Sequence, residues 1–225
     1  MATDLRQSEL IKRIASVVGH ELRNPLAVIN NSSYFVRTKL GSGGALDPKV
    51  EKHLGIMASE VARADRLIAD LLAYSRPLEL VKTRKALADV VAAAVDSLDR
   101  PAGVKVVVKP MKDSLEADVD CAKLAEAARR LLENAVEAAA PSGTVTVTVG
   151  RDKGFSFIEV RDTGPGIKQE ILRSLFEPFF TGKPRGLGLG LALARKIAQA
   201  HGGRAEGGNA PDGGARFRLL VPHGR

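Results

Sequence analysis

The first third of the chain carries two stripes of apolar residues at helical spacing. Between residues 4 and 40, apolar side chains recur at steps of three and four positions. Gly41-Ser-Gly-Gly44 interrupts this stripe, and Asp47-Pro48 offers a helix N-cap followed by a proline suited to a first turn. A second stripe continues until Ser75-Arg-Pro77 ends it. The pattern predicts a helical hairpin over residues 1–76.

A hairpin of two helices leaves part of each apolar stripe without a partner. The usual solution pairs two hairpins across a twofold axis, so that four helices enclose one core. We therefore predict a homodimer held together by a four-helix bundle. The alternative is that the stripe packs against the rest of the same chain.

Beyond Pro77 the pattern changes to short strands and helices. Thr144–Val149 alternates polar and apolar residues, and Phe155–Arg161 follows as a second strand, so these two segments are expected to pair. The other expected elements are helices over 86–98, 122–140, 171–175 and 187–200, and strands over 104–109 and 216–221. Strands and helices mixed in this order predict an α+β sandwich over residues 86–225, after a linker at residues 77–85.

Composition excludes several classes of protein. The chain has 225 residues, of which 44% are hydrophobic and 27% charged, as in ordinary globular domains. No apolar run approaches the roughly 20 residues that span a bilayer, and the first residues lack the apolar core of a signal peptide. Cys121 is the only cysteine, so no internal disulfide or thiolate metal cluster is possible. These features predict a cytoplasmic location without membrane contact.

The net charge of +8 arises from 34 basic and 26 acidic residues. No run of Lys and Arg dominates either part of the chain. Only two tyrosines and seven phenylalanines are available to stack on bases. We therefore predict no nucleic-acid partner. The mild basic excess suits an acidic protein partner or a polyphosphate ligand.

The first helix contains the segment His20-Glu-Leu-Arg-Asn-Pro25. His20 lies two positions from stripe residues on either side, about 200° around the helix, so it should face solvent. An exposed neutral imidazole is a usable nucleophile, and Glu21 beside it could accept the ring proton. Asn24, one turn further on, could hold a water or a substrate oxygen. Taken alone, these residues fit an ordinary helix surface equally well.

Two glycine-rich segments in the second domain suggest a nucleotide site. Asp162-Thr-Gly-Pro-Gly166 follows a strand, and its carboxylate could accept a hydrogen bond from an exocyclic amine such as that of adenine. Gly186-Leu-Gly-Leu-Gly190 leads into a helix, where free N–H groups favour phosphate. Lys183 and Arg185 precede it and could meet a terminal phosphate. Each feature alone also fits a loop that needs glycine and solvated charge.

An asparagine interrupts the Ala-rich helix in the segment Leu131-Leu-Glu-Asn-Ala135. Asparagine is disfavoured in the middle of a helix, so Asn134 invites a functional explanation. Its amide oxygen suits Mg²⁺, which prefers oxygen ligands.

In this order the motifs resemble the sequence boxes of bacterial two-component sensor histidine kinases. The segment at His20 resembles the H box, the segment at Asn134 the N box, and the two glycine-rich segments the Gly boxes. Phe176–Phe180 resembles the F box, and Gly213-Gly-Ala-Arg-Phe217 the closing glycine segment. The likeness runs from about residue 8 to Pro222. It implies a dimeric phosphotransfer hairpin followed by an α/β-sandwich ATP-binding domain of the Bergerat type.

The resemblance also implies a role for each motif. His20 would attack the γ-phosphate of ATP with Glu21 as the base, and Asn24 would place a water for dephosphorylation of the partner. The phosphoryl group would pass to an aspartate in the receiver domain of a response regulator. Asn134 would bind Mg²⁺, and Asp162 would select adenine. The remaining nucleotide-binding residues would be Gly164, Gly166, Lys183, Arg185, Gly186, Gly188, Gly190 and Leu191.

One position departs from the family pattern. The N box usually has another asparagine four residues before the metal ligand, and here that position is Arg130. Related ATPases hold a glutamate there that activates water, a task that arginine cannot perform because it stays protonated. Arg130 therefore argues against an ATPase that uses water and fits transfer to His20. It would either contact phosphate directly or weaken the magnesium site.

Three other functions are alternatives. A stand-alone ATPase or a protein-serine kinase would share the nucleotide fold but would not need His20. A catalytically silenced dimeric module that docks a regulator would keep the hairpin, and Arg130 is the residue that favours it. A nucleic-acid binder is the weakest alternative, because the chain lacks a basic stripe.

Overall fold

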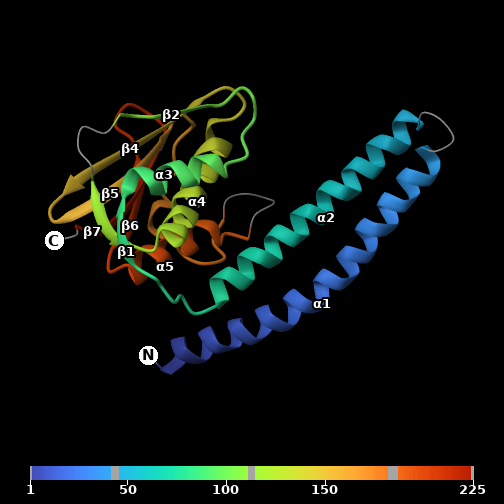
Figure 1. Ribbon diagram of the computed structural model, residues 1–225, viewed down its shortest axis with the longest axis horizontal. Helices are drawn as coiled ribbons and strands as arrows, with labels where there is room; N and C mark the ends of the chain where they lie inside the picture. The colour runs from blue at the N-terminus through green and yellow to red at the C-terminus, as the bar shows by residue number, and fades with distance from the viewer. Residues whose placement is uncertain (1, 42–45, 111–114, 182–186, 224–225) are drawn as a thin grey trace. The chain divides into compact units, whose positions relative to one another are not determined.

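The computed structural model divides into two compact units, Met1–Pro77 and Leu78–Arg225. Figure 1 shows the long helices of the first unit and the sheet and helices of the second. The structure describes residues 2–41 (the backbone alone for 2–21), 46–110, 115–181 and 187–223.

The first unit is a helical hairpin, as predicted. Helix α1 spans Ala2–Gly41 and helix α2 spans Pro48–Ser75. Asp47 is the N-cap of α2, because its side chain accepts a hydrogen bond of 2.7 Å from the backbone N–H of Lys49. The expected cap and the proline in the first turn are confirmed.

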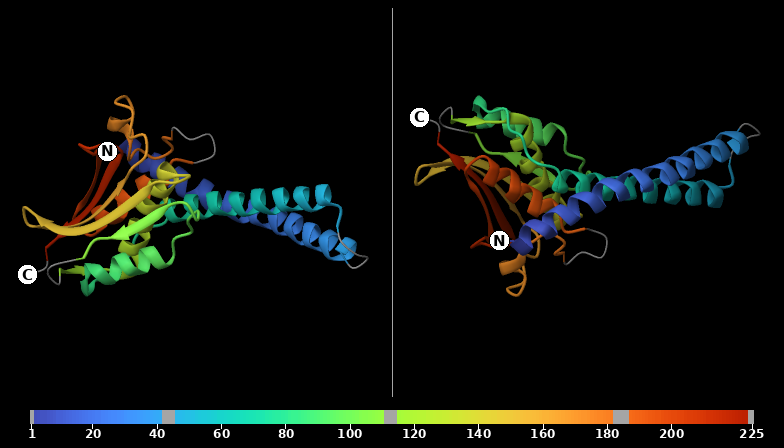
Figure 2. Two further views of the ribbon diagram at one scale, coloured as in Figure 1. Left: turned by 90° about the horizontal axis from the view of Figure 1, so that it is seen from above. Right: turned by 90° about the horizontal axis from the view of Figure 1, so that it is seen from below.

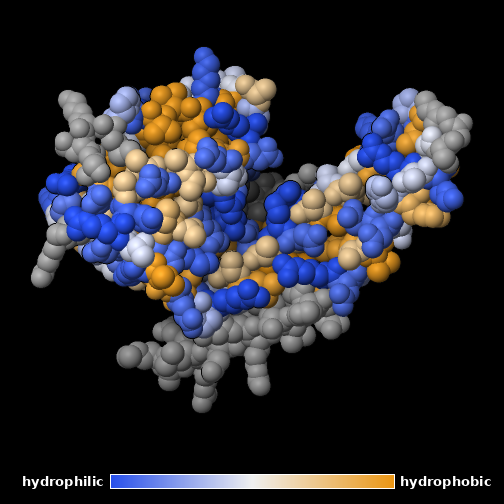
Figure 3. Space-filling model, viewed as in Figure 1, coloured by the Kyte–Doolittle hydropathy of each residue, from blue (hydrophilic) through white to orange (hydrophobic). Residues whose placement is uncertain are grey.

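Only part of the apolar stripe is buried within the hairpin. Leu54 and Val61 of α2 are buried, whereas Leu22, Ile29 and Val36 of α1 are 46%, 44% and 42% exposed. These three α1 residues follow one another at seven-residue spacing, so they lie on one side of the helix. Hydrophobic residues reach the surface along the hairpin (Figure 3). The dimeric bundle that would cover them stays a prediction.

The second unit is an α/β sandwich, as expected. Its helices α3, α4 and α5 pack on one face of a five-stranded sheet with the order β2-β4-β5-β7-β6 (Figures 1 and 2). Strands β1 and β3 form a separate two-stranded sheet. The bounds are β1 Thr83–Ala86, α3 Leu87–Asp96, β2 Lys105–Val108, β3 Glu116–Val119, α4 Cys121–Ala139, β4 Thr144–Asp152, β5 Phe155–Asp162, α5 Gly190–Ala200, β6 Arg204–Asn209 and β7 Ala215–Pro222.

The core lies between the large sheet and the helices. Strands β4 and β5 pair antiparallel, which confirms the predicted hairpin, and Val145 pairs with Asp162 at one end of it. Alternate residues are buried along β5 and in the first half of β4, for example Val160 and Val147, while α4 contributes Leu131 and Leu132 from the other layer. Strand β2 runs parallel to β4, and the remaining pairs are antiparallel.

Several expected boundaries were wrong. Strands β1, β3 and β6 were not predicted, and β1 lies within the residues expected as linker and the start of a helix. The helix expected over 171–175 is a short 3₁₀ turn at Leu172–Ser174. The helix expected from residue 187 begins at Gly190. The missed strands are short and polar, so they form because neighbouring strands offer hydrogen-bond partners rather than through their own apolar pattern.

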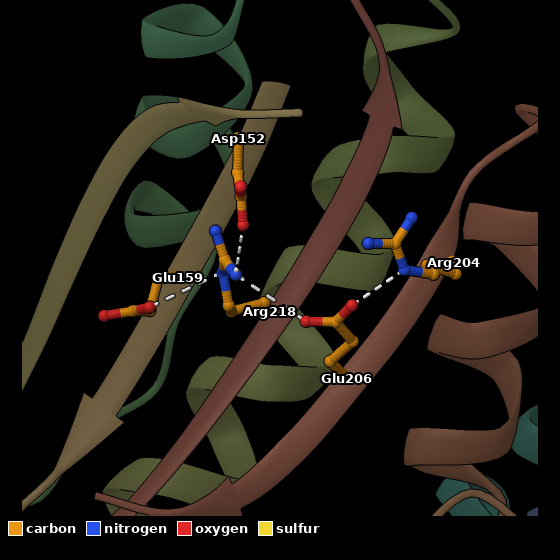
Figure 4. Close-up of polar contacts among 5 residues, drawn as sticks. All are labelled: Asp152, Glu159, Arg204, Glu206 and Arg218. Atoms are coloured by element: carbon orange, nitrogen blue, oxygen red, sulfur yellow. Dashed lines mark hydrogen bonds and ion pairs between the residues drawn. The ribbon is translucent and has the colours of Figure 1, made fainter. Parts of the chain in front are cut away.

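The sheet face opposite the helices is held by a charged network (Figure 4). Arg218 of β7 contacts Asp152 at 3.1 Å and both Glu159 and Glu206 at 3.6 Å. Its guanidinium lies 4.0 Å from the ring centroid of Phe157. The charge of Arg218 is balanced by carboxylates on neighbouring strands of the same sheet. We therefore assign this network a structural role.

Candidate nucleotide site

The site is built around Asp162, the last residue of β5. The side chain is buried, and its Oδ1 accepts hydrogen bonds from the backbone N–H groups of Gly164 at 2.8 Å and Ala215 at 3.1 Å. Its Oδ2 is buried and has no hydrogen-bond partner among the described residues. One carboxylate oxygen therefore shapes the loop, and the other can accept a hydrogen bond from a ligand.

Two glycines allow the backbone to come close around Asp162. A Cβ atom on Gly164 would lie 2.5 Å from the carbonyl oxygen of Ala138 in α4. Gly166 has a φ of +77°, a conformation that side-chain-bearing residues rarely adopt. The predicted role of these glycines in shaping the loop agrees with this geometry, and their contact with a nucleotide stays a prediction.

Asn209 of β6 was not predicted as part of the site. Its Oδ1 accepts a hydrogen bond of 2.6 Å from the backbone N–H of Ile167, and its Nδ2 donates to the carbonyl oxygen of Ile167 at 2.9 Å. The side chain therefore fixes the loop that follows Gly166. Only the fold brings these positions together, because they are 42 residues apart.

Helix α4 approaches this loop at Ala138 and carries two polar residues of the expected site region. Asn134 is half-buried and lies one turn from Ala138 on the same side of the helix. Arg130 lies one turn earlier, and its Cδ would be 3.9 Å from a Cβ atom on Gly190, the first residue of α5. The structure thus brings the N-box segment and the second glycine segment together.

The second glycine segment packs against the F-box segment. Gly188 has a φ of +67°, and a Cβ atom there would lie 2.3 Å from the carbonyl oxygen of Phe180. Glycine is therefore required at this position. Leu191 is half-buried in the first turn of α5. Three residues of the expected site lie outside the described residues, namely Lys183, Arg185 and Gly186.

The residues expected to carry out phosphotransfer and dephosphorylation belong to helix α1. Positions 20 and 21 are helical, but the side chains of His20 and Glu21 lie outside the described part of the chain. Asn24 is exposed on the same helix.

A buried histidine ties together the two helices that border the site. His201, at the end of α5, donates from Nδ1 to the carbonyl oxygen of Ile197 at 2.8 Å, and its Nε2 accepts from the backbone N–H of Asp120 at 3.0 Å. Asp120 is the N-cap of α4. Burial lowers the pKa of His201, and the charge of Lys82 acts in the same direction. The ring is therefore neutral in the folded state.

This arrangement predicts that stability depends on pH through His201. Because the folded-state pKa is below 6.5, the unfolded chain binds the proton first, and stability should fall as pH drops below about 6.5. Melting temperatures at pH 7.5 and 5.5 test this: His201→Gln should lose much of the difference, and the exposed His53→Gln should keep it. Equal pH dependence in wild type and His201→Gln would contradict the assignment.

Fold and site together define a class of protein. The second unit is an α/β sandwich that contains a buried hydrogen-bond acceptor, Oδ2 of Asp162, and two glycine-rich loops. Helix α5 starts at the second of these loops. These features together are typical of a nucleotide-binding unit. In this chain it follows a helical hairpin. Within the described residues, no helix is long and apolar enough to cross a membrane.

Comparison with known proteins identifies the family. Residues 10–79 match the His Kinase A (phospho-acceptor) domain, and residues 119–225 match the histidine kinase-, DNA gyrase B- and HSP90-like ATPase domain. The chain belongs to the sensor histidine kinases of two-component systems and contains the ATP-binding catalytic core of that family.

Relatives with similar sequences are sensor kinases of greater length. Sensor histidine kinase ZraS of Klebsiella oxytoca is 32% identical over 216 residues, which cover 93% of this chain and 45% of ZraS. Sensor protein FixL of Bradyrhizobium diazoefficiens is 32% identical over 234 residues, which cover 96% of this chain and 46% of FixL. The chain therefore spans less than half the length of these relatives.

Solved structures show the same fold. Full-length ShkA in complex with AMPPNP matches with a TM-score of 0.72 and 22% identity, over 94% of this chain and 46% of ShkA. Histidine kinase ThkA in complex with the response regulator TrrA matches with a TM-score of 0.68 and 22% identity, over 97% of this chain and 63% of the ThkA chain.

Proposed function

We propose that this chain is an ATP-dependent protein histidine kinase that phosphorylates His20 and passes the phosphoryl group to an aspartate of a response regulator. The observation that carries the proposal is the buried Oδ2 of Asp162, an acceptor with no partner among the described residues, beside the glycine loops of an ATPase domain. The complex of ThkA with a response regulator supports the same kind of partner for this chain. Such a kinase would act in the cytoplasm.

Each site residue would have a separate role in nucleotide binding or phosphoryl transfer. Asp162 would accept from the amino group of adenine, while the N–H groups at the start of α5 would face the phosphates. Asn134 would hold a magnesium ion, which would neutralise negative charge on the phosphates. A ring nitrogen of His20 would bond to the γ-phosphorus as the bond to the bridging oxygen of ADP breaks. Glu21 would take the proton from the other ring nitrogen.

Incubation with γ-labelled ATP and magnesium tests this function. A bond between phosphorus and a ring nitrogen should be lost in acid and survive in alkali, so label on the chain should show this stability. An acid-stable label would instead indicate a hydroxyl acceptor, as in a protein-serine kinase. ATP binding without label would favour the silenced docking module.

We propose in addition that Asn24 serves in dephosphorylation of the regulator. It is exposed on α1, one turn beyond position 20, where its amide could hold a water beside the bound partner. This role is secondary to the kinase reaction and uses the same helix.

The proposed dimer leads to a prediction about oligomeric state. Ile29→Glu should convert a dimer into a monomer, because it places a charge within the exposed apolar stripe of α1 that the bundle would bury. Light scattering should give twice the chain mass of 23.9 kDa for wild type and one chain mass for the variant. Val107→Glu is the matched control, because Val107 is 45% exposed in the second unit. A monomeric wild-type chain would contradict the bundle.

A further inference from the structure

The five-stranded sheet has two outer edges, and they differ in their side chains. Strand β6 forms one edge, and its charged residues Arg204 and Glu206 pair with each other at 2.7 Å. Strand β2, with the sequence Lys-Val-Val-Val, forms the other edge, and among the described strands it pairs with β4 alone. Hydrophobic residues reach the surface in the region of β2 (compare Figures 1 and 3). An exposed apolar edge is a surface on which another strand can pair.

The outer side of β2 presents backbone groups that can bond to a further strand. The N–H of Lys105 donates to the carbonyl oxygen of Gly143 at 3.0 Å, and the N–H of Lys109 donates to β4 at 2.9 Å. Because alternate residues of a strand bond to the same neighbour, the N–H and C=O groups of Val106 and Val108 point away from β4. Within the described part of the chain, no hydrogen bond to these groups is found.

The loop before β2 forms one wall of a groove along this edge. The groove has a volume of about 460 Å³ and is lined by residues 100–102 and 104–107. The N–H of Val104 donates to the carbonyl oxygen of Pro101 at 3.0 Å, which holds the loop beside the strand. Val107 and Val108 are 45% and 42% exposed. A strand bound here would therefore cover apolar side chains as well as bond to the backbone.

Exposed cations flank the same edge. Arg100 lines the groove, and Lys105 and Lys109 lie on either side of the valines. None of the three forms an ion pair with a described residue. The nearby Asp212 pairs with Arg161 at 2.5 Å, and this bond lowers the pKa of Asp212 more than the attraction of Lys109 does. The edge therefore attracts negative charge.

The spacing of the two lysines distinguishes between possible partners. Lys105, Val107 and Lys109 lie on one face of the strand, because side chains alternate between the two faces. A second copy of β2, paired antiparallel about Val107, would place Lys105 opposite Lys109. Like charges directly opposite one another destabilise a strand pair. The lysines therefore oppose pairing with a second copy and favour a strand that carries acidic residues at both positions.

We propose that the outer edge of β2 binds an extended acidic segment of a partner protein, which adds a sixth strand to the sheet. This segment carries acidic residues four positions apart, next to Lys105 and Lys109, with β-forming residues between them. Main-chain hydrogen bonds provide the affinity, and the two lysines select acidic residues. The surface shares no residue with the proposed nucleotide site, so the inference is independent of the kinase reaction.

Titration of the full chain with labelled synthetic peptides tests the proposal. The acidic probe is Glu-Val-Thr-Val-Glu, capped at both ends, and the basic control Lys-Val-Thr-Val-Lys keeps the same central residues. Both sequences are symmetrical, so they fit either strand direction. Fluorescence anisotropy should show that the acidic probe binds at least about tenfold more tightly than the basic control, because two favourable charge pairs replace two repulsive ones.

N-methylation of the acidic probe shows whether it binds as a strand. One version carries methyl groups on the nitrogens of both valines, and the other carries them on the nitrogens of threonine and the second glutamate. A strand directs only alternate N–H groups towards one neighbour. One version should therefore lose at least about tenfold in affinity, while the other binds nearly as the parent peptide does. Equal affinities of the two versions would contradict strand addition.

Variants of the chain assign the binding to β2. Combining Lys105→Glu with Lys109→Glu should reverse the preference, so that the basic peptide binds more tightly than the acidic one. Arg151→Glu is the matched control, because Arg151 is an exposed cation of β4 beyond the residues that pair with β2, and it should bind as wild type does. Melting temperatures check that each variant is folded.

Three results would overturn the proposal. The first is that wild type does not bind the acidic probe at concentrations up to about 1 mM. The second is that the doubly reversed variant keeps the preference for the acidic peptide. The third is that Val106→Pro, which removes an outer N–H, lowers the mass of the chain in light scattering. In that case a second copy would occupy the edge.

Discussion

Replacing Asp162 with asparagine is expected to weaken the binding of ATP by at least about 100-fold while leaving the fold intact. Oδ1 of Asp162 accepts from two backbone N–H groups, and the amide oxygen of asparagine can keep these bonds. The amide NH₂ group must then occupy the place of Oδ2. A donor would face the amino group of adenine, which is also a donor, so the pair would repel and both groups would lose a hydrogen bond.

The most specific test of the role of Asp162 compares nucleotides that differ in their base. Calorimetry should show loss of AMPPNP binding in Asp162→Asn, with a melting temperature close to that of wild type. Inosine triphosphate has a carbonyl where ATP has the amino group, so it should bind Asp162→Asn better than it binds wild type. Asp118→Asn, an exposed residue of β3, is the matched control and should bind as wild type does. Unchanged AMPPNP affinity in a folded Asp162→Asn would remove Asp162 from the adenine site.

The sequence was sufficient to predict those elements whose apolar pattern repeats over several helical turns or strand positions. The hairpin of α1 and α2 and the pair of β4 and β5 follow from such patterns. Strand β6, with the sequence Arg-Ala-Glu-Gly-Gly-Asn, has no such pattern. It exists because β7 offers it a full edge of hydrogen-bonding groups. Short strands of this kind depend on the tertiary structure and cannot be predicted from local spacing.

The same distinction applies to the candidate site. Asp162 and the glycines around it are recognisable because they form one continuous segment at the end of a strand. Asn209 and His201 are not, because each acts through a partner far along the chain. Their hydrogen bonds fix the loop after Gly166 and the ends of α4 and α5. Such supporting contacts can be recognised only once the fold of the chain is known.

Three of the four histidines have side chains that the structure describes, and their surroundings bear on which histidine could accept the phosphoryl group. His201 is buried, and both of its ring nitrogens are hydrogen-bonded. His223 is half-buried, and its Nδ1 lies 3.0 Å from the hydroxyl oxygen of Ser156. His53 is exposed on α2, so among the histidines with described side chains it is the one with the most accessible ring. It is therefore the strictest control for His20, which lies in the matched phosphoacceptor domain.

His20→Gln is expected to abolish the acid-labile label from γ-labelled ATP, whereas His53→Gln should be labelled as wild type is. Glutamine fills a similar volume but has no ring nitrogen that can bond to phosphorus, so the loss should be complete rather than partial. Calorimetry with AMPPNP should show wild-type affinity for both variants, because both residues belong to the first unit and the residues proposed to bind the nucleotide belong to the second. Label that persists in His20→Gln and disappears in His53→Gln would move the acceptor to α2. If both variants lose the label but still bind AMPPNP, substitutions anywhere in the hairpin would block transfer. The experiment would then not identify the acceptor, and the assignment of His20 alone would be contradicted.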